Sequence, residues 1–96
     1  MVYNSNIVLL NAGLATTSAT AIKRGSYQVS AYGTWGGATA TLQWSYDGTT
    51  WLSIDSLTAF TANGTVGVLL GDGFVRVSVA NAGTTSLTVV LTALDL

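Results

Sequence analysis

Residues 65–94 read TVGVLLGDGFVRVSVANAGTTSLTVVLTAL and contain three sets of apolar side chains separated by two short breaks. Within each set, the apolar residues stand at every second position. The sets are Val66, Val68 and Leu70, then Val75, Val77 and Val79, then Leu87, Val89 and Leu91. Because side chains of a β-strand point alternately to opposite faces, this period of two indicates three strands, each apolar on one face.

The first break contains the pair Asp72-Gly73 and predicts a tight turn. A two-residue loop pairs Leu70 with Val75 and keeps both apolar sets on one face of the sheet. Asp-Gly is also a preferred sequence for the type I′ turn of such hairpins.

The second break, Asn81-Ala82-Gly83, calls for a different loop because both of its neighbouring apolar sets occupy odd positions. A two-residue loop would separate these sets, whereas a three-residue loop with Gly83 in the left-handed conformation keeps them together. Residues 65–94 are therefore predicted to form a three-stranded antiparallel meander. Arg76 falls on the face opposite the apolar one.

The rest of the chain has the same character: it has no Pro, and Gly, Asn and Asp separate runs of β-branched and aromatic residues. No segment shows a sustained helical period. Strands are predicted at 6–11, 26–35, 39–46, 50–57, 65–70, 74–80 and 86–94, with 12–24 as an eighth strand or an arm. The sequence thus predicts one domain, in which residues 1–24 form an N-terminal strand or arm. Residues 25–96 form an antiparallel β-sandwich, similar to a jelly roll, of about seven or eight strands.

Residues 44–51, WSYDGTTW, contain a further turn, and two loops fit them. A three-residue loop centred on Asp47 pairs Leu42 with Leu52. In this arrangement Gly48 takes the left-handed conformation and the Asp47 side chain caps the turn.

A two-residue loop, Asp47-Gly48, would instead pair Trp44 directly with Trp51. Burying two aliphatic side chains at about 1.5–3 kcal/mol each outweighs an aromatic-pair bonus of about 0.5–1.5 kcal/mol, which favours the three-residue loop. Trp44 is then predicted to lie in the core. Trp51 is predicted to lie on the outer face beside Gln43.

The charged residues exclude several classes of site. The chain has no His and no Cys, so it lacks the ligands of zinc and copper sites and the groups of Ser–His–Asp or Cys–His catalysis. Four scattered Asp do not make a calcium loop, and three basic residues do not make a nucleic-acid footprint. No apolar run reaches about 18 residues, so no membrane span is expected. We therefore expect no catalytic residue, metal, cofactor, nucleic acid or membrane partner, and a protein that is not an enzyme.

The apolar content is high for so short a chain. Hydrophobic residues make up 49% of the 96 residues, and the mean hydropathy is +0.51. A small domain buries a smaller share of its surface than a large one, and exposed apolar patches usually mark interfaces. The composition therefore favours a homo-oligomer or a larger assembly.

Several side chains are candidates for contact with a partner. Lys23 and Arg24 form either an anchor for an acidic surface or a solvated loop tip. Trp35 either lies exposed at an interface or folds back over the end of the sandwich. Trp35 or Trp51 could instead be a stacking platform for a sugar, which would also need convergent polar groups. The candidate contact residues are Tyr3, Ile7, Lys23, Arg24, Trp35, Trp51 and Arg76.

Two segments, GSYQVSAYGTWGGATATLQWSYDGTTW at 25–51 and GFVRVSVANAGTTSLTVVL at 73–91, resemble small structural proteins of tailed bacteriophages. The shared features are a Gly-X-Tyr strand, a Gly-Gly-Ala-Thr turn, an L-x-x-S-x-D-G-x-x-W hairpin and a late R-V-x-V strand near a glycine turn. The resemblance covers about residues 25–92.

The resemblance implies a β-sandwich or jelly-roll module of the virion without catalytic residues. It favours a capsid decoration (cement) protein that binds the major capsid protein or another virion protein. Such a protein is assembled in the host cytoplasm and lies on the capsid exterior as a homo-oligomer, with a trimer favoured. A tail, neck or fibre component shares this fold, and a carbohydrate-binding module is an alternative of another class. With residues 1–24 as an anchoring arm, a chain lacking residues 1–20 should fold but no longer bind capsids.

Overall fold

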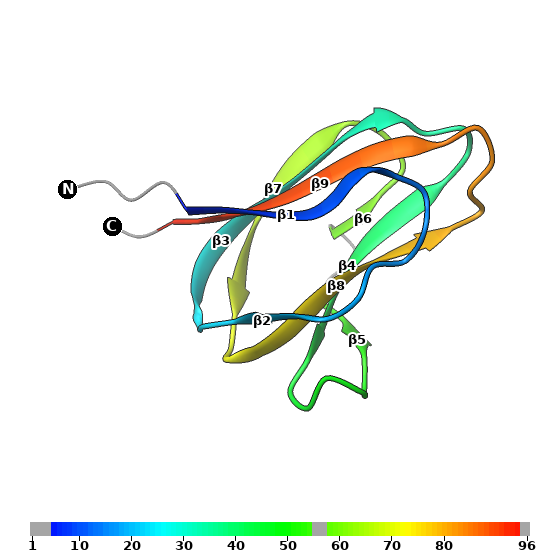
Figure 1. Cartoon of the computed structure of the whole chain (residues 1–96). Helices are drawn as coiled ribbons and strands as arrows, with labels where there is room; N and C mark the ends of the chain where they lie inside the picture. The colour runs from blue at the N-terminus through cyan, green and yellow to red at the C-terminus, as the bar shows by residue number, and fades with distance from the viewer. Residues whose placement is uncertain (1–4, 55–57, 95–96) are drawn as a thin grey trace.

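The computed structural model describes residues 5–54 and 58–94, which form two antiparallel β-sheets packed face to face (Figure 1). Sheet A has the strand order β1-β9-β3-β7. Sheet B has the order β2-β8-β4-β5, and β6 also pairs with β4. The strands are β1 (Ser5–Gly13), β2 (Thr20–Ile22), β3 (Gly25–Thr34), β4 (Thr39–Ser45), β5 (Leu52–Ser53), β6 (Ala59–Phe60), β7 (Gly64–Leu70), β8 (Gly73–Ala80) and β9 (Ser86–Ala93).

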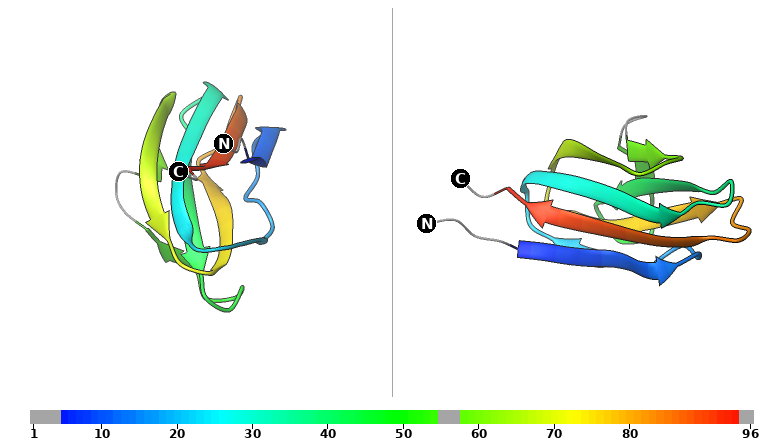
Figure 2. Two further views of the ribbon diagram at one scale, coloured as in Figure 1. Left: turned by 90° about the vertical axis from the view of Figure 1, so that its left-hand side faces the viewer. Right: turned by 90° about the horizontal axis from the view of Figure 1, so that it is seen from above.

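Consecutive strands mostly alternate between the two sheets, and Figure 2 shows the two layers from the end of the sandwich. β1, β3, β7 and β9 belong to sheet A, and the strands between them belong to sheet B. This is the pairing pattern of a jelly roll. The predicted all-β sandwich is confirmed, with nine described strands instead of seven or eight. Its six long strands begin and end within two residues of the predicted positions, but the predicted strand at 50–57 is wrong, because only Leu52–Ser53 pairs among its described residues.

The predicted meander over residues 65–94 is wrong, because β7 and β9 pair with β3 whereas β8 pairs with β4. Val68 lies opposite Tyr27, and Val77 lies opposite Leu42. The three apolar sets do all face the core, but they reach it from two different sheets. Alternation shows which side chains point inward and carries no information on the sheet to which a strand belongs.

The Asp72-Gly73 connection crosses from sheet A to sheet B and is not a type I′ turn, because neither residue has a positive φ. Gly73 is needed for another reason. A Cβ there would lie 2.4 Å from the carbonyl oxygen of Ser45 and 2.9 Å from the indole nitrogen of Trp44. Only a residue without a side chain lets β8 approach β4 so closely.

The connection through residues 81–83 also crosses between the sheets. Its left-handed residue is Asn81, with φ of +58°, and not Gly83 as predicted. Asn tolerates this conformation better than most residues. The Gly83 N–H donates to the Thr85 hydroxyl over 3.0 Å, which holds the turn in place.

The hairpin around residues 44–51 keeps its predicted face but has a different register. Leu52 pairs with Trp44 and not with Leu42, so the loop is longer than three residues. The inward side of β4 still carries Leu42, which is buried, while Leu52 at the sheet edge is 52% exposed. Gly48 has φ of +83°, as predicted for the turn.

Most of the N-terminal segment is part of the sandwich. β1 pairs with β9 from Ser5 to Gly13, and β2 pairs with β8. Between these strands the Thr17 N–H donates to the carbonyl of Val77 over 3.0 Å, and its hydroxyl accepts the Val77 N–H over 2.9 Å. The segment therefore covers an edge of each sheet. Tyr3 lies outside the described residues.

A chain without residues 1–20 would lose β1 and expose the edge of β9. The expectation that such a chain still forms an intact sandwich therefore conflicts with the fold. An unpaired central strand is a template for association with other chains.

Candidate functional site

The loop after β4 is held by a network of polar side chains. The Ser45 hydroxyl, which is buried, donates to the Asp47 carboxylate over 2.9 Å and accepts the N–H of Gly48 over 2.8 Å. The same carboxylate accepts the N–H groups of Thr50 and Thr49 over 2.8 and 2.9 Å. These N–H groups, that of Thr50 first, and the Ser45 hydroxyl hold the pKa of Asp47 well below its ordinary value. Asp47 therefore serves the turn, and all of these bonds lie within the loop.

Trp51 and Arg76 contact each other on the outer face of sheet B. The Arg76 guanidinium carbon lies 4.6 Å from the centre of the indole ring, and Arg76 Nε donates to Gln43 Oε1 over 2.8 Å. Trp51 thus lies near Gln43 as predicted, and the Arg76 side chain contacts both residues. One face of the indole is occupied by this cation–π contact, which attaches the loop to the sheet.

Trp35 folds back over the end of the sandwich. Its indole N–H donates to Asn63 Oδ1 over 2.9 Å, and its carbonyl accepts the Thr85 hydroxyl over 2.8 Å. Trp35 and Ile7 both pack against the core. Both side chains therefore contribute more to the fold than to the exposed surface.

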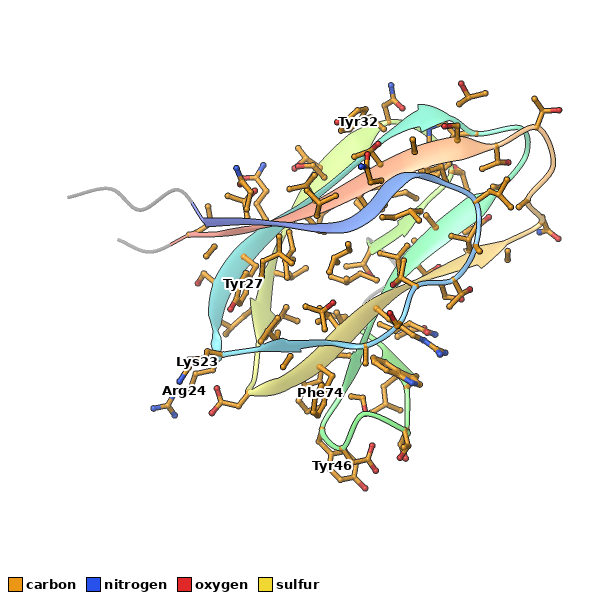
Figure 3. The ribbon with its side chains drawn as sticks, in the orientation of Figure 1. Lys23, Arg24, Tyr27, Tyr32, Tyr46 and Phe74 are labelled. Atoms are coloured by element: carbon orange, nitrogen blue, oxygen red, sulfur yellow. The ribbon has the colours of Figure 1, made fainter. Side chains whose placement is uncertain are left out.

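Lys23 and Arg24 lie exposed at the turn between β2 and β3, and Figure 3 shows both side chains projecting from the sandwich. The Arg24 N–H donates to Asp72 Oδ1 over 2.6 Å, which ties this turn to the one before β8. Neither basic side chain has an ion-pair partner within the described part of the chain. The turn is thus fixed while its two positive charges face solvent.

The outer face of sheet A carries no charged side chain at any described position. It bears a cross-strand row of Val8, Val90, Ser30 and Thr65, in which each residue lies opposite the next. A second row joins Asn6, Thr92 and Gln28. Other residues of this face include Ser26, Tyr32, Thr34, Gly67, Leu69, Ser86 and Thr88.

Hydrogen bonds within this face fix its polar side chains. Gln28 Nε2 donates to Thr65 Oγ1 over 2.8 Å, and the Thr92 hydroxyl donates to Asn6 Oδ1 over 2.8 Å. The charged residues that the structure describes lie in the end turns, in the loop after β4 or on β8. Within residues 5–54 and 58–94, the outer face of sheet A is therefore uncharged, and its polar groups are partly satisfied.

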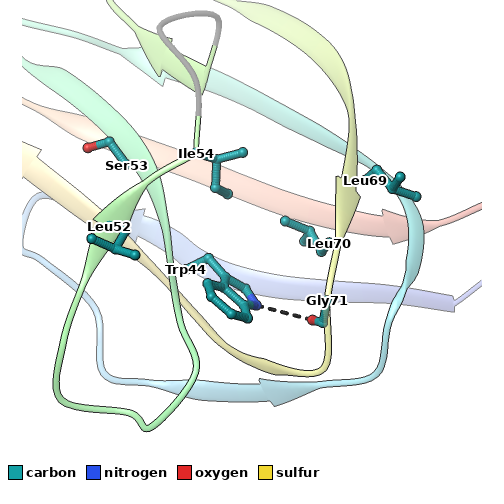
Figure 4. A pocket seen from close by; sticks show the side chains of 7 residues that line it. All are labelled: Trp44, Leu52, Ser53, Ile54, Leu69, Leu70 and Gly71. Atoms are coloured by element: carbon teal, nitrogen blue, oxygen red, sulfur yellow. Dashed lines mark hydrogen bonds between the residues drawn. The ribbon is translucent and has the colours of Figure 1, made fainter.

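An apolar groove of about 290 Å³ runs along the edge of the sandwich, between β7 of sheet A and β5 of sheet B (Figure 4). The Trp44 indole forms its floor and donates its N–H to the Gly71 carbonyl over 3.1 Å. Leu52 and Ile54 form one wall, and Leu70 forms part of the other. Leu52 is 52% exposed, so the groove leaves apolar surface in contact with water.

The structure does not gather the predicted contact residues on one surface. Arg76 and Trp51 lie on sheet B, whereas Lys23 and Arg24 lie at one end of the sandwich. The sequence interpretation missed the exposed side chains of Val8, Tyr32 and Leu69.

Two further classes of site find no support in residues 5–54 and 58–94. No group of three or more metal-ligating side chains occurs there. No helix in these ranges has the length and apolar character to cross a membrane.

Comparisons with protein-family models, with curated proteins and with solved structures found no match for this chain. Its candidate function therefore rests on its own residues and geometry.

Proposed function

We propose that this protein is a non-enzymatic structural protein of a tailed-bacteriophage virion, and specifically a decoration (cement) protein on the capsid exterior. Its partner is the major capsid protein or another virion protein, and it acts as a homo-oligomer, with a trimer favoured. It is assembled onto the shell in the host cytoplasm. The phage resemblance of residues 25–92 supplies the class of protein.

The observation that carries the proposal is the uncharged outer face of sheet A. Cores of protein interfaces are depleted of charged side chains, and a face with Val8, Val90 and Tyr32 among hydroxyl and amide groups has this composition. A protein that binds only the assembled shell stabilises it by mass action. This function needs buried area and shape, and needs no titratable chemistry.

A carbohydrate-binding module is supported less well. Such a site needs an exposed aromatic platform beside convergent polar groups. The indole of Trp35 is hydrogen-bonded to Asn63, and one face of Trp51 is occupied by Arg76. A tail, neck or fibre component would use the same uncharged face with a different symmetry.

The proposal is tested by the mass of the soluble protein and by its co-sedimentation with purified capsids of the phage that encodes it. We expect an oligomer that sediments with the shells. Val90→Lys places a charge at the centre of the uncharged face and should weaken shell binding by about tenfold or more. Ala21→Lys changes an exposed side chain of β2 in sheet B. It is the matched control and should bind as the wild type does. Failure of the wild type to bind shells contradicts the proposal.

A further inference from the structure

Sheet A has an open edge at β7, where a regular strand lacks the usual protection. β7 pairs with β3 over residues 64–70 without a register shift, and it contains neither a charged residue nor Pro. No described strand pairs with its other side. Free edges in natural proteins are normally short, bulged, charged or covered.

The other edges of the sandwich each have such protection. β1 has register shifts on both sides of Leu10. β2 is three residues long, and the rest of the β8 edge is covered by Thr16 and Thr17, which accept the N–H groups of Val79 and Val77. β5 and β6 are two residues long. β7 therefore differs from every other edge in the described part of the sandwich.

The apolar groove lies directly beside this open edge. Val66 and Val68 of β7 point toward the core but are only half-buried, and Leu70 lines the groove next to Trp44. A strand added to β7 would continue sheet A over the groove. Because its side chains alternate, every second one would point toward Trp44 and Ile54.

A positive charge lies at the end of the groove. Leu69, Leu70 and Gly71 also line a recess that includes Arg24 and Gly25, so Arg24 lies near the C-terminal end of β7. The Asp72 carboxylate binds the Arg24 backbone N–H, but the Arg24 guanidinium has no ion-pair partner among the described residues. An occupant with a carboxylate at this end would complement it.

We propose that β7 binds an extended segment of a partner protein by strand addition. The segment runs antiparallel to β7, as all pairs in both sheets do, and places alternate apolar side chains in the groove. An acidic residue near its N-terminal end lies beside Arg24. This inference deepens the proposed function, since the partner would be the shell protein.

A second copy of this chain fits the edge less well. Antiparallel pairing of two β7 strands about Gly67 brings Leu70 of one copy to Gly64 of the other. Arg24 would then lie near Asn63, which is uncharged, and its charge would stay unpaired. Charge complementarity therefore favours a different chain with an acidic residue.

The first experiment measures fluorescence anisotropy with a labelled peptide, N-acetyl-Asp-Val-Thr-Val-Thr-Val-Thr. Two further peptides are N-methylated at alternate residues, so that each blocks the amides on one edge of the strand. We expect the parent peptide to bind and one methylated peptide to bind at least about tenfold more weakly, while the other keeps its affinity. No binding up to millimolar concentration, or equal binding of all three, would overturn strand addition.

The second experiment uses variants of the protein. Leu52→Asp, which places a charge in the groove, should weaken peptide binding about tenfold. Leu14→Asp, also at an exposed leucine but away from the groove, should not. Arg24→Gln should weaken binding by about two- to fivefold for the Asp peptide and leave an Asn version unchanged. Equal effects of Arg24→Gln on both peptides would contradict the assigned carboxylate contact.

The proposed function and this inference fail in different ways. Peptide binding at β7 without shell binding would remove the shell as partner and leave the edge site in place. Shell binding that Leu52→Asp does not change would overturn the edge site and leave the proposed function. A soluble dimer that Leu52→Asp converts to a monomer in analytical ultracentrifugation would identify a second copy as the occupant and overturn the inference.

Discussion

At the scale of single residues, Asp47 shows how a candidate site becomes a structural element. Its carboxylate accepts bonds from two backbone N–H groups and the Ser45 hydroxyl, all within the loop after β4. A loop with so many internal bonds has one preferred conformation. That conformation brings Trp51 to the outer face of sheet B, where Arg76 covers one face of the ring.

The bonds to Asp47 make the stability of the fold dependent on pH. Because the pKa of Asp47 is lower in the folded chain, its carboxylate stabilises the fold above the unfolded pKa. This contribution is lost as the pH falls below about 4 toward the folded pKa. Asp47→Asn keeps an acceptor oxygen without the charge, so it should lower the urea midpoint at neutral pH. Its difference from the wild type should shrink between about pH 4 and pH 2, and a constant difference would contradict this assignment.

Substitution by Ala should have opposite effects on the free energy of unfolding at Gly73 and at Gly67. A methyl group at Gly73 meets the Ser45 carbonyl oxygen, so Gly73→Ala should lower the free energy of unfolding by about 1–3 kcal/mol. Gly67 has no positive φ, and a methyl group there comes no closer than 4.0 Å to the Tyr27 carbonyl oxygen. Gly67→Ala should be neutral or stabilise by up to about 1 kcal/mol. Urea unfolding of both variants measures this, and equal losses would contradict the account of Gly73.

At the scale of elements, some strands cover the edge of a neighbouring strand, whereas β7 has an edge at which a partner strand could pair. β1 covers β9, and the segment from Thr16 to Ile22 covers β8. β7 alone keeps a long regular edge beside an apolar groove in the described part of the chain. The N-terminal strands therefore stabilise the sandwich, and the open edge at β7 lies on the opposite side of sheet A.

This division predicts how the chain responds to truncation. Deleting residues 1–13 removes β1 and exposes the edge of β9, so the protein should aggregate and lose its β-sheet circular dichroism signal on mild heating. Deleting residues 1–4 leaves every described strand in place and is the matched control. A monomeric, fully folded product of the longer deletion would show that β1 is dispensable.

At the scale of the whole molecule, the charged residues are unevenly distributed and strands far apart in the sequence pair with each other. The described charged residues lie in turns, in the loop after β4 or on β8, and one complete sheet face has none. The fold joins the two ends of the chain, since Asn6 and Thr92, 86 positions apart, share a hydrogen bond. β1 therefore pairs only after the chain has been made as far as β9.

Such long-range pairing predicts slow folding, and the absence of Pro predicts a single kinetic phase. Non-local contacts slow folding, so refolding should take roughly milliseconds to seconds. The chain contains no Pro, so the slow phase of tens of seconds that comes from prolyl isomerisation should be absent. Stopped-flow refolding with and without a prolyl isomerase measures this. A slow phase that the isomerase accelerates would be inconsistent with the sequence.

Several features of the candidate surfaces could be predicted from the sequence. The alternation of Leu42 and Trp44 placed both on the inward side of β4, and the Asp-Gly pair at 47–48 marked the turn. The partners of Trp35 and Trp51 could not be predicted, because Asn63 and Arg76 lie 28 and 25 positions away and no local pattern connects them.

The sequence by itself determined that the chain is all-β, where its long strands lie and which side chains face the core. These properties follow from the pleat of each strand, which has a period of two and is local. Only the tertiary structure decided which sheet each strand joins, and hence that sheet A has an uncharged outer face and an open edge at β7. A strand has the same alternation of apolar residues whichever sheet of a sandwich it belongs to, so sheet membership depends on pairing between distant residues.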